Sequence, residues 1–249
     1  YICARLVANE NAKRKLVLVL AVVINLGILA VFKYSGFFVE SLNSVTGLAI
    51  PVPQIDLPIG ISFFTLQAVS YLFDVYRGLI KADDNILRLA LFMSFFPQIV
   101  EGPICRYGQT ANQLWNVKQI EFENLKLGAV RILFGLMKKL VIADRLNPMI
   151  KQIFSHYDDY QGGIIALGAI AYTIQLYCDF SGTMDAVMGV AQIFGVTMPE
   201  NFQRPFFSKS ISEFWKRWHI TLGTWFKDYI FYPVTMSKPM KNLTSSARK

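Results

Sequence analysis

The sequence predicts an all-α protein: a polytopic integral membrane helical bundle that includes re-entrant or broken helices. Of its 249 residues, 53% are hydrophobic and only 17% are charged, whereas about 25% of the residues of a typical soluble domain are charged. The mean hydropathy is +0.37, which indicates that much of the apolar surface faces lipid. This composition excludes disordered, collagen-like and disulfide-scaffold classes.

The charge balance points to the same environment. The chain has 25 Lys and Arg against 17 Asp and Glu, a formal net charge of +8. Such an excess suits either nucleic acid or an anionic membrane surface. On so apolar a chain we expect membrane lipid as the partner and no nucleic acid. Cys3, Cys105 and Cys178 are far apart in sequence, so neither a disulfide framework nor a metal site is expected.

Leu16–Phe32 is the clearest membrane-spanning candidate. Its 17 residues would cover roughly 25 Å as a helix, so Lys15 and Lys33 at its ends must extend toward the headgroups. Several basic residues precede this span, and residues 34–58 contain none. The positive-inside rule therefore predicts that the N-terminal flank is cytoplasmic.

Further apolar stretches complete the predicted bundle, at residues 59–73, 89–96, 127–142, 163–177 and 186–198. The polar residues of the first favour a helix buried among others. The second is too short to span and runs into Pro97, which predicts a broken or re-entrant helix. The third contains Arg131, Lys138 and Lys139, so these charges must point inward or lie at the interface.

Two carboxylates, Asp179 and Asp185, lie between apolar stretches on either side of Gly182. Charge in such a place is costly unless the groups pair or serve a site. Gly182 favours an interruption of the helix here, in which case Asp179 could instead cap the helix that follows. Glu101 presents the same choice between a site residue and the cap of a broken helix.

Residues 210–231 predict an amphipathic helix at the membrane interface. Ser210 followed by Glu213 forms a capping box, so the helix is expected to begin at Ile211. Cations on this segment, Lys216 and Arg217 among them, suit a position near lipid phosphates. Helical spacing places five apolar residues of this segment on one face: Phe214, Trp218, Leu222, Trp225 and Tyr229.

His219 is the candidate base on this segment. A neutral imidazole can take a proton from a hydroxyl and return it near neutral pH. Helical neighbours Trp215 and Lys216 would lower its pKa and keep it a base. The alternative is an interfacial histidine that only bonds a backbone carbonyl, and His156 is expected in a solvated loop. Nucleotide-binding, serine-hydrolase and zinc-protease motifs are absent from the sequence, which leaves those classes unsupported.

Five groups of residues in order resemble the motifs of the membrane-bound O-acyltransferase family, and within it the alginate O-acetyltransferase branch. Each group alone is weak evidence, but their common order is specific. The groups are 58–65 with 71–78; 96–103 with Arg106 and Tyr107; 177–182 with Asp185; 199–205; and 212–219 with Trp225, Asp228 and Tyr229.

The resemblance implies a multi-pass protein of a bacterial cell membrane with a tunnel that ends at a buried histidine, here His219. The implied donor is cytoplasmic, such as acetyl-CoA or an acyl carrier, with no tightly bound cofactor. The implied acceptor is an exported polysaccharide such as alginate, or a partner acetyltransferase protein. Residues that could support the site are Asp179, Asp185, Trp215, Trp218, Lys216 and Arg217.

The family pattern also includes a second histidine, in a downstream Trp-His-Gly context that does not occur within residues 1–249. We therefore expect residues 1–249 to form the central portion of a single transmembrane domain in a longer protein. Teichoic-acid D-alanylation and peptidoglycan O-acetylation are alternative activities within the family. From other classes, a transporter or channel is disfavoured because no internal symmetry is visible, and a non-catalytic scaffold for a soluble acyltransferase remains open.

Overall fold

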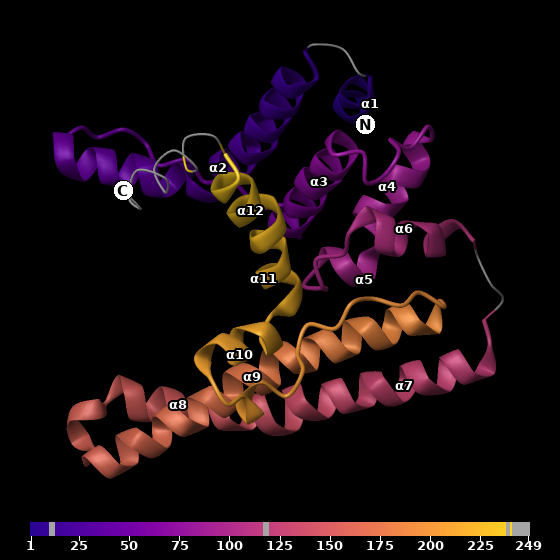
Figure 1. Ribbon diagram of the computed structural model, residues 1–249. Coiled ribbons are helices and arrows are strands. Elements are labelled where there is room, and N and C mark those ends of the chain that lie inside the picture. The colour runs from indigo at the N-terminus through magenta and orange to yellow at the C-terminus, as the bar shows by residue number, and fades with distance from the viewer. Residues whose placement is uncertain (10–12, 117–119, 238–239, 241–249) are drawn as a thin grey trace, which may run out of the picture. The chain divides into compact units, whose positions relative to one another are not determined.

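The computed structural model describes residues 1–9, 13–116, 120–237 and 240 (Figure 1). Every regular element in these ranges is helical, and the one β contact among them is an isolated antiparallel bridge between Phe202 and Trp218. The all-α prediction is therefore confirmed. The chain divides into two compact units: residues 1–100, 104–115 and 224–249 form unit 1, and residues 101–103 and 116–223 form unit 2.

Unit 1 contains one long helix, α2, and several shorter ones. Its elements are α1 Ile2–Ala8, α2 Arg14–Thr46, α3 Ile61–Tyr76, α4 Ile86–Ser94, α5 Phe96–Ile99, α6 Tyr107–Trp115, the π-helical segment η4 Lys227–Phe231 and α12 Tyr232–Thr235. Helix α11, Ile220–Phe226, begins in unit 2 and ends in unit 1.

Helix α2 contains the predicted span Leu16–Phe32 but is much longer, with 33 residues. At 1.5 Å per residue it reaches about 50 Å, well beyond a hydrocarbon core of roughly 30 Å. It ends where Gly47 takes a left-handed conformation and donates its N–H to the carbonyl of Asn43. Apolar side chains along it, such as Leu20 and Val23, are exposed, as expected of a helix that faces lipid.

Two other predictions for unit 1 are confirmed. Helix α3 buries Gln67 and Ser70, so its polar side chains do lie inside the protein. The stretch after residue 86 is a broken helix, in which α4 stops at Ser94 and α5 is a single turn. Gln98 covers part of the break, because it is fully buried and its amide donates to the carbonyl of Phe92.

Unit 2 is built on a pair of long helices. Its elements are α7 Phe122–Leu136, the π-helical segment η1 Met137–Ala143, α8 Asp144–Ser155, the short 3-10 turns η2 Tyr157–Asp159 and η3 Pro205–Phe207, α9 Gly162–Ile193 and α10 Ile211–Arg217. In Figure 1, α7 and α9 run side by side along the length of this unit.

Glycines bring α7 and α9 into backbone contact. Gly128 faces Gly189, and Gly135 faces Gly182, which fixes an antiparallel register. A Cβ atom on Gly128 would lie 2.6 Å from the carbonyl oxygen of Gly189, a separation that real Cβ atoms essentially never show. Small residues at such crossings are typical of helix packing inside membranes.

Helix α9 corrects the prediction made around Gly182. It runs without interruption from Gly162 to Ile193, so the expected break at Gly182 is wrong, and Asp179 caps no helix. The stretches 163–177 and 186–198 are mostly one helix rather than two. A side chain at position 182 would clash with α7, because a Cβ atom there would lie 2.7 Å from the carbonyl oxygen of Gly135.

Two helices of the described chain, α2 and α9, are long and apolar enough to cross a membrane. They agree with the membrane prediction at this coarser level. A larger number of crossings, and a single domain over residues 1–249, stay predictions.

Candidate functional site

The segment that carries His219 is bent, not straight. Helix α10 ends at Arg217, Trp218 is extended, and His219 has a φ of 45°, a left-handed conformation that is uncommon for any residue other than glycine. The predicted continuous helix over residues 211–231 is therefore wrong. Only its start is confirmed, because the Ser210 hydroxyl accepts the N–H of Glu213 at 3.1 Å.

The break divides the predicted apolar stripe between the two units. In unit 2, Phe214 and Trp218 stack with ring centroids 5.5 Å apart. In unit 1, Trp225 donates its indole N–H to the carbonyl of Leu66 at 3.0 Å. The stripe residues on either side of His219 thus have different partners, and they do not form one interfacial face.

Asn201 holds the break in place. Its backbone carbonyl accepts the N–H of Ile220 at 3.0 Å, and its side-chain Oδ1 accepts both the N–H and the hydroxyl of Thr221, at 3.1 and 3.0 Å. Ile220 and Thr221 are the first two residues of α11. Their N–H groups need outside acceptors because the first N–H groups of a helix have no partner within it. Asn201 is only 1% exposed, so a residue far away in sequence caps this helix from the interior.

The side-chain oxygen of Asn201 also determines which nitrogen of the His219 ring carries the hydrogen. Nδ1 of the imidazole lies 3.1 Å from Oδ1 of Asn201. A backbone N–H can only donate, so the atom that meets the N–H of Thr221 must be the amide oxygen, and Nδ1 must carry the hydrogen that faces it. Nε2 is then the unprotonated nitrogen, and no described residue forms a hydrogen bond with it.

The surroundings of His219 favour its neutral form. The ring is half-buried and meets Phe180 edge to face, with centroids 4.8 Å apart. Burial lowers the pKa of His219, which lies outside α2 and α9. The predicted lowering is confirmed, but burial causes it: Trp215 and Lys216, the expected neighbours, are both exposed.

A cavity of about 540 Å³ opens in unit 2, with Asn201 in its wall. Asn201 therefore contacts both the imidazole and this space. The other lining residues include aromatic rings, hydroxyls and five charged groups. They are Phe134, Lys138, Tyr177, Ser181, Met184, Asp185, Met188, Glu200, Phe202, Gln203, Arg204 and Arg217.

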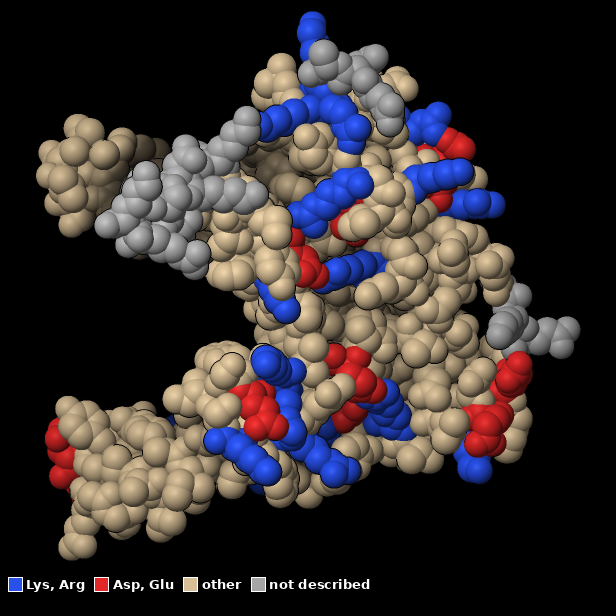
Figure 2. Space-filling model, viewed as in Figure 1, with Lys and Arg blue, Asp and Glu red and all other residues tan. Residues whose placement is uncertain are grey.

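Ion pairs link Asp185 in the cavity wall to α7 and to η1. Asp185 accepts hydrogen bonds from Arg131 at 3.0 Å and from Lys138, while Arg131 also pairs with Glu200 at 2.7 Å. Lys138 is 8% exposed and reaches the hydroxyl of Ser181 at 3.1 Å. In Figure 2, blue and red side chains lie together across the middle of this unit. Of the two alternatives expected for the charges in residues 127–142, Arg131 and Lys138 follow the inward one.

The remaining predicted site residues separate into two sets. Asp185 and Arg217 line the cavity, and Trp218 packs against Phe202 with ring centroids 5.0 Å apart. Asp179 pairs with Lys139 away from the cavity lining, and Trp215 and Lys216 are exposed. Glu101 and His156 are also exposed, and the described residues include no group of three or more possible metal ligands.

Asn201 is the residue that sequence reasoning missed. It lies within residues 199–205, which the sequence marks as a motif without assigning a role. An asparagine after a long apolar helix gives no local sign of its partner, because His219 is 18 residues away. Only the fold reveals the pairing.

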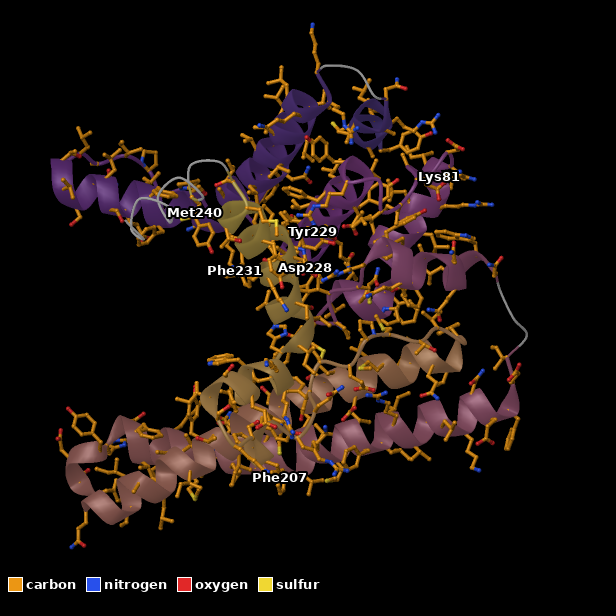
Figure 3. The ribbon with its side chains drawn as sticks, in the orientation of Figure 1. Lys81, Phe207, Asp228, Tyr229, Phe231 and Met240 are labelled. Atoms are coloured by element: carbon orange, nitrogen blue, oxygen red, sulfur yellow. The ribbon has the colours of Figure 1, made fainter. Side chains whose placement is uncertain are left out.

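Unit 1 has a separate polar cluster that joins residues at the C-terminal end of α3, just before α6 and in η4. The hydroxyl of Tyr229 donates to Asp74 at 2.8 Å, and Arg77 donates to the backbone carbonyl of Asp228 at 2.9 Å. Arg106 forms an ion pair with the Asp228 carboxylate. Figure 3 labels Asp228 and Tyr229, neighbours on η4. Each ionised group here has a partner, so the cluster fixes η4 within unit 1.

Comparisons with known proteins identify the family of this chain. Residues 64–248 match the family model described as MBOAT, membrane-bound O-acyltransferase family. The chain is 41% identical over 229 residues to the "Probable alginate O-acetylase AlgI" of Azotobacter vinelandii. The matched region covers 90% of this chain and 45% of the relative.

More distant relatives have other names. The chain is 32% identical to the peptidoglycan O-acetyltransferase of Helicobacter pylori, with 91% of this chain and 48% of the relative covered. It is 34% identical to the teichoic acid D-alanyltransferase of Bacillus subtilis, with 74% and 48% covered. The chain spans about half the length of these curated relatives. The chain belongs to the membrane-bound O-acyltransferase family.

Proposed function

We propose that the full-length protein is a membrane O-acetyltransferase that uses His219 in acid/base catalysis. The acetyl group would come from a cytoplasmic donor, such as acetyl-CoA or an acyl carrier, and would pass to hydroxyls of an exported polysaccharide such as alginate. Family membership supports acyl transfer. The choice of acetyl and alginate rests on the identity of 41% to the alginate O-acetylase relative, against 32–34% for the peptidoglycan and teichoic-acid relatives.

The observation that carries the proposal is the imidazole of His219. Asn201 holds its Nδ1 at 3.1 Å and leaves Nε2 as a proton acceptor. A sugar hydroxyl is a poor nucleophile until a base removes its proton. A half-buried, neutral imidazole in one fixed tautomer is suited to that task.

Acyl transfer would take place in two steps, attack and collapse. The hydroxyl proton passes to Nε2 of His219 while the hydroxyl oxygen attacks the carbonyl carbon of the donor thioester. The carbon–sulfur bond breaks when the tetrahedral intermediate collapses, and the imidazolium returns its proton to the departing sulfur. The products are an acetyl ester and a free thiol, and His219 is neutral again.

The test replaces His219 by glutamine in the full-length protein. His219→Gln should reduce acetylation of the exported polysaccharide to background while the protein still accumulates in the membrane, because glutamine cannot accept the proton. Acetyl content of the isolated polymer is the measurement. His156→Gln is the matched control, since this other histidine is exposed at the end of α8, and it should retain wild-type acetylation.

The same strains distinguish the alternatives. Peptidoglycan acetate and teichoic-acid D-alanine esters are measured in parallel. If one of these falls in the His219→Gln strain while acetylation of the exported polysaccharide does not, the acceptor or the acyl group is a different one. Wild-type acetylation in the His219→Gln strain would contradict the catalytic assignment. It would favour a scaffold that recruits a separate acyltransferase.

A further inference from the structure

Arg204 differs from the other cations around the cavity of unit 2. Lys138 pairs with Asp185, Arg131 with Asp185 and Glu200, and Arg217 with Glu213 at 2.6 Å. Arg204 lines the cavity and is exposed. Within the described part of the chain, no carboxylate forms an ion pair with it.

The charged groups that line the cavity, taken together with their ion-pair partners, carry one net positive charge. The four cations are Arg131, Lys138, Arg204 and Arg217, and the three carboxylates are Asp185, Glu200 and Glu213. One positive charge therefore remains, and the pairing assigns it to Arg204. A single uncompensated guanidinium at a cavity wall favours an anionic ligand.

The backbone at Arg204 is also unusual. Its φ is 47° and its ψ is 59°, although it precedes Pro205 and such residues ordinarily adopt extended conformations. Neighbouring contacts hold this geometry: Pro205 is buried, and the N–H of Gln203 donates to the carbonyl of Arg217 at 3.0 Å. Left-handed conformations of residues other than glycine concentrate at ligand-binding and active sites.

The walls indicate what kind of ligand would fit. A volume of about 540 Å³ falls in the usual range for small-ligand sites. Aromatic rings from Tyr177 and Phe202 offer flat surfaces for stacking, and Gln203 offers hydrogen bonds. Guanidinium binds carboxylate or phosphate with two parallel hydrogen bonds.

We propose that this cavity binds an anionic group of a substrate and that Arg204 recognises it. The aromatic and hydrogen-bonding walls suit an acidic sugar unit of the acceptor, and a phosphate of the acyl donor has the same chemistry. This proposal rests on the proposed function, because Asn201 joins the cavity to His219.

Kinetics of the purified full-length enzyme test the proposal. Three variants separate charge from backbone: Arg204→Gln removes the charge, Arg204→Lys keeps it, and Arg204→Gly keeps the left-handed backbone. For an oligosaccharide of acidic sugars, Arg204→Gln and Arg204→Gly should raise KM about tenfold or more, with kcat little changed. Arg204→Lys should lie between them and the wild type. Lys209→Gln, an equal loss of charge at an exposed residue outside the cavity lining, should match the wild type.

Two further arms identify the anion. With the carboxyl groups of the acceptor reduced to alcohols, wild type and Arg204→Gln should show equal KM values if the anion belongs to the acceptor. A higher KM for acetyl-CoA in Arg204→Gln would instead support a donor phosphate at the same site. Unchanged KM values for both substrates in Arg204→Gln would overturn the proposal.

A binding measurement keeps this result separate from the proposed function. Full-length His219→Gln protein should still bind the acidic oligosaccharide or acetyl-CoA, and adding Arg204→Gln should weaken that binding about tenfold or more. Activity that survives His219→Gln would reject the proposed catalytic role alone. Binding of both ligands that survives Arg204→Gln would reject the anion site alone.

Discussion

Helix α9 and the segment around His219 depart from their local sequence patterns in opposite directions. In α9, Gly182 and two nearby acids suggest an interruption, yet the helix continues for 32 residues. Between residues 211 and 231 the spacing suggests one helix, yet the chain turns at His219 with a φ of 45°. In each region the local pattern is misleading because a distant segment determines the outcome.

The distant segments act in opposite ways. Against α9, α7 approaches so closely that only glycine fits at position 182, and Asp185 pairs with Arg131 of α7 and with Lys138 of η1. At the break, Asn201 supplies the acceptors that a continuing helix would have supplied from its own preceding turn. Close packing therefore preserves a helix in α9, while substitute hydrogen bonds allow the break at His219.

The largest effect is expected from removing the substitute hydrogen bonds. Asn201→Leu nearly preserves volume but leaves the Thr221 N–H and hydroxyl and the His219 Nδ1–H without their shared acceptor. A buried polar group without a partner costs about 1–3 kcal/mol. We expect acetyl transfer to fall about 100-fold or more, since the tautomer of His219 is no longer fixed, and unfolding in detergent to occur at a lower temperature.

A matched asparagine provides the control. Asn112 is exposed on α6, so Asn112→Leu should change neither activity nor unfolding temperature. An Asn201→Leu protein with wild-type activity would show that the hydrogen bond to Nδ1 has no part in catalysis.

Next in size is the effect of a methyl group on the α7–α9 contact. A Cβ atom at position 182 would lie 2.7 Å from the carbonyl oxygen of Gly135, so Gly182→Ala must push the helices apart. Overpacking of this kind costs about 1–3 kcal/mol. Unfolding in detergent, followed by circular dichroism, should therefore begin at a lower temperature.

Gly163→Ala is the same substitution in the same helix, at a position where nothing lies within 4 Å of the added atom. It should be neutral or slightly stabilising, because alanine favours helix. Equal unfolding temperatures for the two variants would mean that α7 and α9 do not pack through their glycines.

These two regions also show how far sequence alone reaches. Leu16–Phe32 and the broken helix before Pro97 were predictable, because both depend on local hydrophobicity and on proline. His219 was identifiable as a candidate base from its residue type and motif. Its partner Asn201 was not, since hydrogen bonds between distant residues leave no periodic signal, and the pairing of Asp185 with α7 was missed for the same reason.

The smallest effect, a shift in pH dependence, tests what the break does for the base. Burial lowers the pKa of His219, so its neutral form persists below the ordinary value of about 6.5. The acidic limb of kcat/KM should therefore lie below pH 6.5. For the same reason the unfolded chain takes up the proton first, and the stability that His219 contributes is present above about pH 6.5 and lost as pH falls through the lower folded value.

Asn201→Asp reverses the sign of this shift while keeping an acceptor for Nδ1–H. A carboxylate at that distance favours the imidazolium, so the pKa of His219 should rise and the acidic limb should move to higher pH. Activity above this limb should largely persist, in contrast to Asn201→Leu, because the tautomer is still held. An acidic limb at the wild-type position in active Asn201→Asp protein would mean that the titrating base is a group other than His219.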